Sequence, residues 1–160
     1  MPESVIEVAR RSLHELVGER WRAFGRAADL LWLGFGASRD VIDHSGESRQ
    51  VSDYAVHVQC PWRVLDGDQL VTGSSDIYSD VQGVNRFDAR AARLTAYLAD
   101  KPVVVTSTQV TAWGDLTISF SDGLRIEALR TGSVRHEEWR FFRPYLEHDH
   151  VVVFEEPGES

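Results

Sequence analysis

The first apolar residues of the chain recur with helical spacing. Ser4 and Glu7 have the S-x-x-E pattern of a capping box, which satisfies backbone amides at the start of a helix. The apolar residues that follow at steps of three and four are Ile6, Ala9, Leu13 and Leu16. We therefore predict an amphipathic helix with one buried stripe that ends near Gly18, because glycine favours helix ends.

Beyond this helix the apolar period changes to two, which is typical of strands. Residues 29–35 are predicted to form a strand with Leu31 and Phe35 on one face. Residues 38–52 are mostly polar and predict an exposed loop or hairpin tip.

Dipeptides that favour tight turns separate the later strands. Asp66-Gly67 predicts a hairpin between the alternating run at residues 54–65 and a return strand from Leu70. Gly114-Asp115 and Asp122-Gly123 predict two more turns. The strands expected in this half of the chain are residues 103–110, 116–120, 124–128, 138–142 and 150–154.

A second short helix is predicted from Asp88, a favourable N-cap residue, to Lys101-Pro102, since proline cannot continue a helix. Hairpins in series build antiparallel sheets. The expected fold class is therefore α+β: a largely antiparallel meander sheet, curled or folded over, with the two helices packed on one face or end. We expect residues 1–154 to form a single domain and residues 155–160 a flexible C-terminal tail.

Charge and composition exclude some partners. The 160 residues carry a net charge of -8, and Lys101 is the only lysine, so we expect no binding to nucleic acid. No run of about 18 apolar residues occurs, which predicts no membrane span. The single cysteine, Cys60, cannot form an internal disulfide, so we expect the protein in the cytoplasm.

His57 and Gln59 share one face of a predicted strand. The pKa of histidine suits a general base, and ordinary hydrogen bonds on a half-buried face are the competing interpretation. Arg63 lies further along the same run. Asp76 and Tyr78 belong to a polar turn that either binds a small anion through its amides or simply connects two strands. These five residues are the candidate ligand contacts.

Cysteine and histidine chemistry receive less support. Cys60 is three residues from His57, which places the two side chains on opposite faces of a strand, so we expect a buried, inert thiol. His148 and His150 are two residues apart and would point to one side of a strand. Two ligands do not complete a metal site. We predict no metal, no cofactor and no catalytic residue.

Aromatic residues and arginines alternate near the C-terminus, in the string Trp139-Arg140-Phe141-Phe142-Arg143. This combination is enriched at binding surfaces and also fills small β cores. We expect Trp32 and Trp139 in the core, and an interaction surface around Arg140 and Arg143.

Three strings of the sequence carry a resemblance. They are residues 25–33 (GRAADLLWL), 56–63 (VHVQCPWR) and 138–142 (EWRFF). With these strings the chain resembles a group of small actinobacterial-type proteins of unknown function. The resemblance implies a bacterial origin and supplies no activity, cofactor or catalytic residue.

Three functions follow as hypotheses. The leading one is a non-catalytic protein-interaction module that binds a partner protein, favoured by small size, acidity and the lack of a catalytic pattern. The alternative is a small-molecule-binding protein or enzyme with a pocket around His57, Gln59 and Arg63. A metal protein using His148 and His150 is a third hypothesis. A homodimer is compatible with each, because sheet edges and aromatic patches pair with their own copies.

Overall fold

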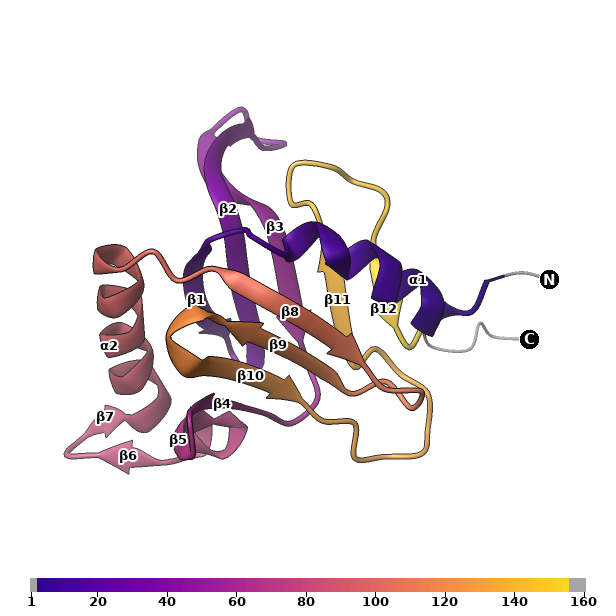
Figure 1. Cartoon of the computed structure of the whole chain (residues 1–160). Coiled ribbons are helices and arrows are strands. Elements are labelled where there is room, and N and C mark those ends of the chain that lie inside the picture. The colour runs from indigo at the N-terminus through magenta and orange to yellow at the C-terminus, as the bar shows by residue number, and fades with distance from the viewer. Residues whose placement is uncertain (1–2, 156–160) are drawn as a thin grey trace.

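Strands dominate the fold and form two five-stranded antiparallel sheets. In spatial order, the first sheet contains β1 (Trp21–Ala27), β2 (Leu30–Ile42), β3 (Ser48–Val58), β11 (Trp139–Phe142) and β12 (Val151–Val153). The second contains β5 (Gln69–Gly73), β4 (Trp62–Asp66), β10 (Leu124–Ala128), β9 (Leu116–Phe120) and β8 (Val105–Val110). The computed structural model describes residues 3–155, and the strands of one sheet cross those of the other (Figure 1). The predicted α+β class with antiparallel sheets is confirmed.

Helical segments and one small hairpin connect the strands. The helical segments are α1 (Val5–Leu13), α2 (Arg86–Asp100) and 3₁₀ turns at His14–Leu16, Ser74–Tyr78 and Ser121–Gly123. The hairpin pairs β6 (Asp80–Val81) with β7 (Val84–Asn85). The predicted capping box of α1 is present, with Ser4 and Glu7 each accepting from the other's backbone amide at 3.2 Å. Within residues 3–155, neither helix has the length and hydropathy of a membrane span.

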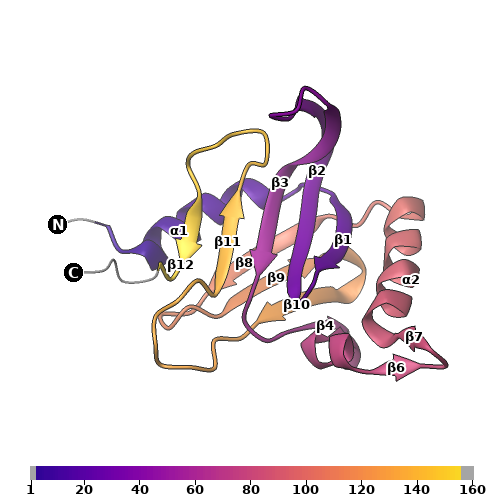
Figure 2. The same ribbon diagram turned by 180° about the vertical axis from the view of Figure 1, so that it is seen from behind.

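The two helices close opposite sides of the space between the sheets. α1 contacts β12 and β8, which are edge strands of the first and the second sheet. α2 contacts the other two edge strands, β1 and β5, and the two views show the helices on opposite sides of the molecule (Figures 1 and 2). Helices that cover sheet edges oppose pairing with another strand. The broad surfaces left uncovered are the outer faces of the two sheets.

Aromatic side chains hold the sheets and α2 together. Trp21 of β1 stacks on Phe120 of β9 with ring centroids 4.3 Å apart, which joins the sheets directly. Phe24, Trp62 and Phe87 come from β1, β4 and α2, and their ring centroids are 5.4–6.0 Å apart. All five rings are at least 95% buried. Burying one such side chain stabilises a fold by about 1.5–3 kcal/mol, and aromatic pairs add to this.

The polar segment 38–52 is mostly paired strand. Ser38 lies opposite Ser52 and Ile42 opposite Ser48, so only residues 43–47 form the tip of the hairpin. The paired residues are largely exposed because this ribbon extends beyond the sandwich (Figure 1). Polar residues on both of its faces therefore reflect exposure to water rather than an irregular loop.

The predicted strand at residues 54–65 is wrong, because the chain changes sheets at residues 59–61. β3 ends in the first sheet at Val58 and β4 begins in the second at Trp62. Pro61 has no amide hydrogen and cannot continue a strand ladder. The amides of Gln59 and Cys60 instead both donate to the Glu138 carbonyl, at 2.9 and 3.1 Å.

Other boundaries also differ from the prediction. α2 begins at Arg86, and its N-cap is Asn85, whose Oδ1 accepts from the Asp88 amide at 3.0 Å. Residues 21–27 form β1, for which the sequence predicted no element. Of the predicted tail at residues 155–160, all but the first lie outside the described residues, and the single domain stays a prediction. The turns at Asp66-Gly67 and Asp122-Gly123 join paired strands as predicted.

We expect Phe87→Ala to lower the free energy of unfolding by about 3–5 kcal/mol, because it leaves a cavity between α2, β1 and β4. Urea denaturation measures the change. Arg93→Ala, at an exposed position of the same helix, is the matched control and should change the free energy by less than about 0.5 kcal/mol. Equal losses for the two variants would contradict the role of the aromatic cluster.

Candidate ligand site

The outer faces of the two sheets differ in chemistry. On the second sheet, Arg63 and Arg125 flank Glu127, and the Arg63 Nε to Glu127 Oε1 distance is 2.6 Å. Thr117 of β9 lies opposite Glu127 on the same face. This surface is polar and ion-paired, as expected for a sheet face in water.

The outer face of the first sheet is apolar and aromatic. Trp32, His57 and Phe142 lie on it and are each half-buried. Ala55 and Val152 share this face and are only 6% and 8% exposed, although they do not belong to the main core. Figure 2 shows that neither helix of residues 3–155 lies across this face. The burial of Ala55 and Val152 therefore comes from neighbouring side chains and loops.

A hollow of about 480 Å³ opens on this aromatic face. Its floor is made of small residues, Ala23, Gly34 and Ala55. Its apolar walls are Trp32, Phe142 and Pro144, with His57 between them, and its polar end contains Arg22, Arg49 and Ser52. A hollow of this size, with apolar walls and few polar groups, is typical of small-molecule sites.

Trp32 lies on the outer face and not in the core, so the prediction for this residue is wrong. Its neighbours Leu31 and Leu33 point inward and are at most 1% exposed, which leaves Trp32 on the other side of β2. A Cβ added to Gly25 would lie only 2.4 Å from the indole ring, so the ring rests directly on the backbone of β1. Trp139 is in the core as predicted, fully buried, with its indole N–H donating to the Gly114 carbonyl at 2.8 Å.

His57 is held as a neutral imidazole. Burial lowers its pKa below the ordinary 6.5, and the positive charge of Arg140 lowers it further. The His57 ring meets the Phe142 ring edge to face, with centroids 4.7 Å apart. Among the side-chain hydrogen bonds of residues 3–155, none involves His57, and neither ring nitrogen is buried without a partner. A ligand in the hollow can therefore use the imidazole as donor or acceptor.

A polar network lies beside the hollow on the same face. Arg140 lies opposite His57 in the strand register and donates to Nδ1 of His150 at 2.7 Å. Glu137 accepts from Arg140 and from the side-chain Nε2 of Gln59. The structure thus brings three predicted residues, His57, Gln59 and Arg140, to one face. Gln59 and Arg140 are already engaged within the chain.

The remaining predicted ligand contacts lie elsewhere. Arg63 is on the outer face of the second sheet and pairs with Glu127. Asp76 accepts from the Thr72 hydroxyl at 2.8 Å and the Gly73 amide at 3.3 Å, which stabilises the turn itself. Tyr78 is 75% exposed. These three do not join His57, because the chain changes sheets between Val58 and Trp62.

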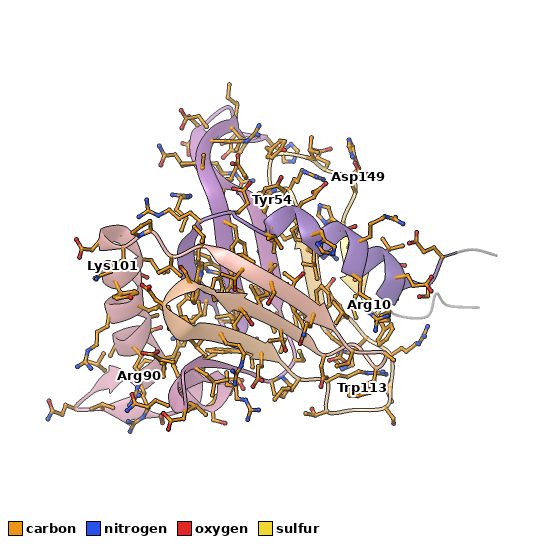
Figure 3. All side chains as sticks on the ribbon, in the orientation of Figure 1. Arg10, Tyr54, Arg90, Lys101, Trp113 and Asp149 are labelled. Atoms are coloured by element: carbon orange, nitrogen blue, oxygen red, sulfur yellow. The ribbon has the colours of Figure 1, made fainter. Side chains whose placement is uncertain are left out.

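Arg140 and Arg143 occupy different sides of β11. Arg140 is on the outer face, whereas Arg143 pairs with Glu15 and lies over the ring of Tyr54. Figure 3 labels Tyr54. Tyr54 in turn stacks on the inward-facing Phe141. Because both arginines have carboxylate partners within the chain, they do not form one free basic surface.

Cysteine and metal chemistry find no support in the described residues. Cys60 is buried as predicted, and burial raises the pKa of its thiol to about 12. His148 bonds to the neighbouring Asp149, while His150 bonds to Arg140, so the two histidines do not converge. Within residues 3–155, no group of three metal-ligating side chains occurs.

A second hollow, of about 420 Å³, lies between α2 and β5. Two of its polar side chains are used by the fold. Arg90 donates to the Val71 carbonyl at 3.0 Å, and the Tyr97 hydroxyl donates to Asp122 at 2.7 Å (Figure 3 labels Arg90). The hollow on the first sheet is the better candidate site because the half-buried rings of Trp32, His57 and Phe142 line it.

Sequence reasoning found His57 and missed the other lining residues. Arg22 and Ser52 lay in segments assigned no strand, and Trp32 was assigned to the core. The alternation of Leu31, Trp32 and Leu33 was the available signal, since it places the indole opposite two core leucines.

No protein-family model, curated protein or solved structure matches the chain. The candidate site therefore rests on its own geometry.

The lowered pKa of His57 gives a pH prediction. Between pH 6.5 and the lower folded pKa, the unfolded chain binds a proton that the folded chain does not, so the free energy of unfolding falls as the pH falls. His57→Gln should reduce this fall between about pH 7 and pH 5, as measured by urea denaturation. His44→Gln, at the exposed hairpin tip, is the control and should leave the fall unchanged. If the free energy of unfolding has the same pH dependence in His57→Gln as in the unchanged protein, the lowered pKa of His57 is contradicted.

Proposed function

We propose that this protein binds a small molecule with a flat apolar body in the hollow on the outer face of the first sheet. One observation carries the proposal: this face gathers half-buried aromatic rings around a hollow, whereas the second sheet's outer face is polar and ion-paired. The alternative hypothesis from the sequence thus gains support, with a different set of lining residues.

The shape of the hollow suits a planar ligand. Ala23 and Ala55 present only methyl groups to the hollow, and the rings of Trp32, Phe142 and His57 line it. Aromatic rings prefer offset-stacked or edge-to-face contacts, which give such a site about 0.5–1.5 kcal/mol per ring pair beyond burial. The imidazole supplies a hydrogen bond that orients the ligand.

The proposal is binding rather than catalysis because, within residues 3–155, no carboxylate forms a hydrogen bond or ion pair with His57. The nearest carboxylate network is that of Glu137, which accepts from Arg140 and Gln59. The leading hypothesis from the sequence, a protein-interaction module acting through Arg140 and Arg143, stays a prediction. Its two arginines are paired within the chain, which weakens its basis.

We expect the neutral aromatic probe 2-naphthamide to shift the amide NMR signals of Ala55 and Ser52, which line the hollow. Ala55→Leu should weaken this binding by about tenfold or more, since overfilling a packed site costs about 1–3 kcal/mol. The control Thr117→Leu makes a comparable change on the outer face of the second sheet and should leave binding unchanged.

Titration by NMR gives the dissociation constants, and each variant is first compared with the unchanged protein in its signal dispersion. Binding that persists in a folded Ala55→Leu variant, or signal changes only outside the hollow, would overturn the proposed site.

A further inference from the structure

We infer that the ligand of this hollow is an organic carboxylate, with its apolar body against the aromatic walls and its carboxylate at Arg22. The inference rests on the proposed function and adds the chemical class of the ligand. It is carried by the charges that line the hollow.

The hollow is positive in an acidic protein. The chain has a net charge of -8, yet the residues that line the hollow include Arg22 and Arg49 and no Asp or Glu. Among the described residues, neither of these arginines has a carboxylate oxygen within 4.0 Å. The arginines at positions 63, 140 and 143, by contrast, each pair with a carboxylate.

Arg22 is fixed in place although no carboxylate of the described residues forms an ion pair with it within 4.0 Å. Its Nη2 donates to the hydroxyl of Ser52 at 3.0 Å, and Ser52 is only 8% exposed, so the contact is well shielded. Its Nε is buried and has no hydrogen-bond partner in residues 3–155. A half-buried guanidinium with unused donors is the arrangement that a carboxylate satisfies, because two parallel N–H groups match its two oxygens.

The nearest carboxylate of the chain is committed elsewhere. Asp53 follows Ser52 on β3, and its Oδ1 accepts from Arg39 while its Oδ2 accepts from the Ala37 amide at 2.8 Å. Arg39 also lies over the ring of Tyr145, with its guanidinium carbon 3.9 Å from the ring centroid. Asp53 thus forms its ion pair with Arg39, and the charge of Arg22, which contributes to lowering the pKa of Asp53, lies beyond 4.0 Å from that carboxylate. The guanidinium of Arg22 therefore stays available to a ligand.

The other groups of the hollow fit the same ligand. The lowered pKa of His57 favours the neutral imidazole, which neither attracts nor repels a carboxylate as a full charge would. The neutral ring can donate one hydrogen bond to a ligand oxygen. Arg49 is exposed and lies at the open polar end, where it attracts an anion at longer range. The apolar walls favour a singly charged acid with an aromatic or aliphatic body.

Two probes of nearly equal shape test the inference, 2-naphthoate and its neutral counterpart 2-naphthamide. At pH 7.5 the unchanged protein should bind the acid about tenfold or more tightly than the amide, since charge-assisted hydrogen bonds are worth about 1.5–3 kcal/mol. Arg22→Gln keeps a donor for Ser52 and should remove this preference while amide binding persists. Arg49→Gln should reduce the preference by a smaller factor.

Two controls separate the outcomes. Arg125→Gln changes an arginine on the outer face of the second sheet and should leave the preference unchanged. The second control uses the unchanged protein and so does not depend on the folding of a variant. Raising the salt concentration from about 0.05 to about 0.5 M should weaken binding of the acid and not of the amide. Equal affinities for acid and amide would overturn the carboxylate assignment and leave the binding site intact. If neither probe shifts signals of the hollow, the proposed function fails as well.

Discussion

The contact between Phe24, Trp62 and Phe87 holds together three elements that are far apart in the sequence. It joins an edge strand of the first sheet, a strand of the second sheet and α2, with every ring at least 95% buried. Because α2 is fixed here, it covers the edges of β1 and β5, and α1 covers the opposite pair of edges. Both open sides of the sandwich are thereby closed.

Closing the sides has a consequence for function. The broad surfaces that remain are the outer faces of the sheets, and only one of them is apolar. On the second sheet, Glu127 pairs with both of its arginine neighbours, so this face is polar and ion-paired. On the first sheet, Trp32 lies across Gly25 and Phe142 packs between His57 and His150. The rings cover much of the sheet and leave a hollow lined by Ala23, Ala55 and Ser52, whose side chain lies over Gly34.

Electrostatics then divide this face into two parts. On one side, Arg140 donates to Glu137 and to His150, so the charge of Arg140 is already paired within the chain. On the other side, Arg22 is held by Ser52 and lacks a carboxylate partner among the described residues, since Asp53 is bound to Arg39. An arginine without a counter-ion beside apolar walls is the feature that gives the proposed site its ligand class.

The sequence by itself determined most local elements, because their signals act over a few residues. The capping box at Ser4 and Glu7, the turns at Asp66-Gly67 and Asp122-Gly123, and the alternation along β9 and β10 all correspond to observed structure. It also determined that Cys60 and Trp139 are buried.

The tertiary structure alone decided which strands share a sheet and which outward residues meet. Around Pro61 the chain passes from the first sheet to the second. This separates His57 from Arg63, which the alternating pattern had placed on one strand. The exposure of the β2–β3 ribbon depends on how far it extends beyond the second sheet. Arg22 and Ser52 are 30 residues apart and meet only through the pairing of β1, β2 and β3. Periodicity shows on which side of a strand a residue lies, but pairing between distant segments decides what lies beside it.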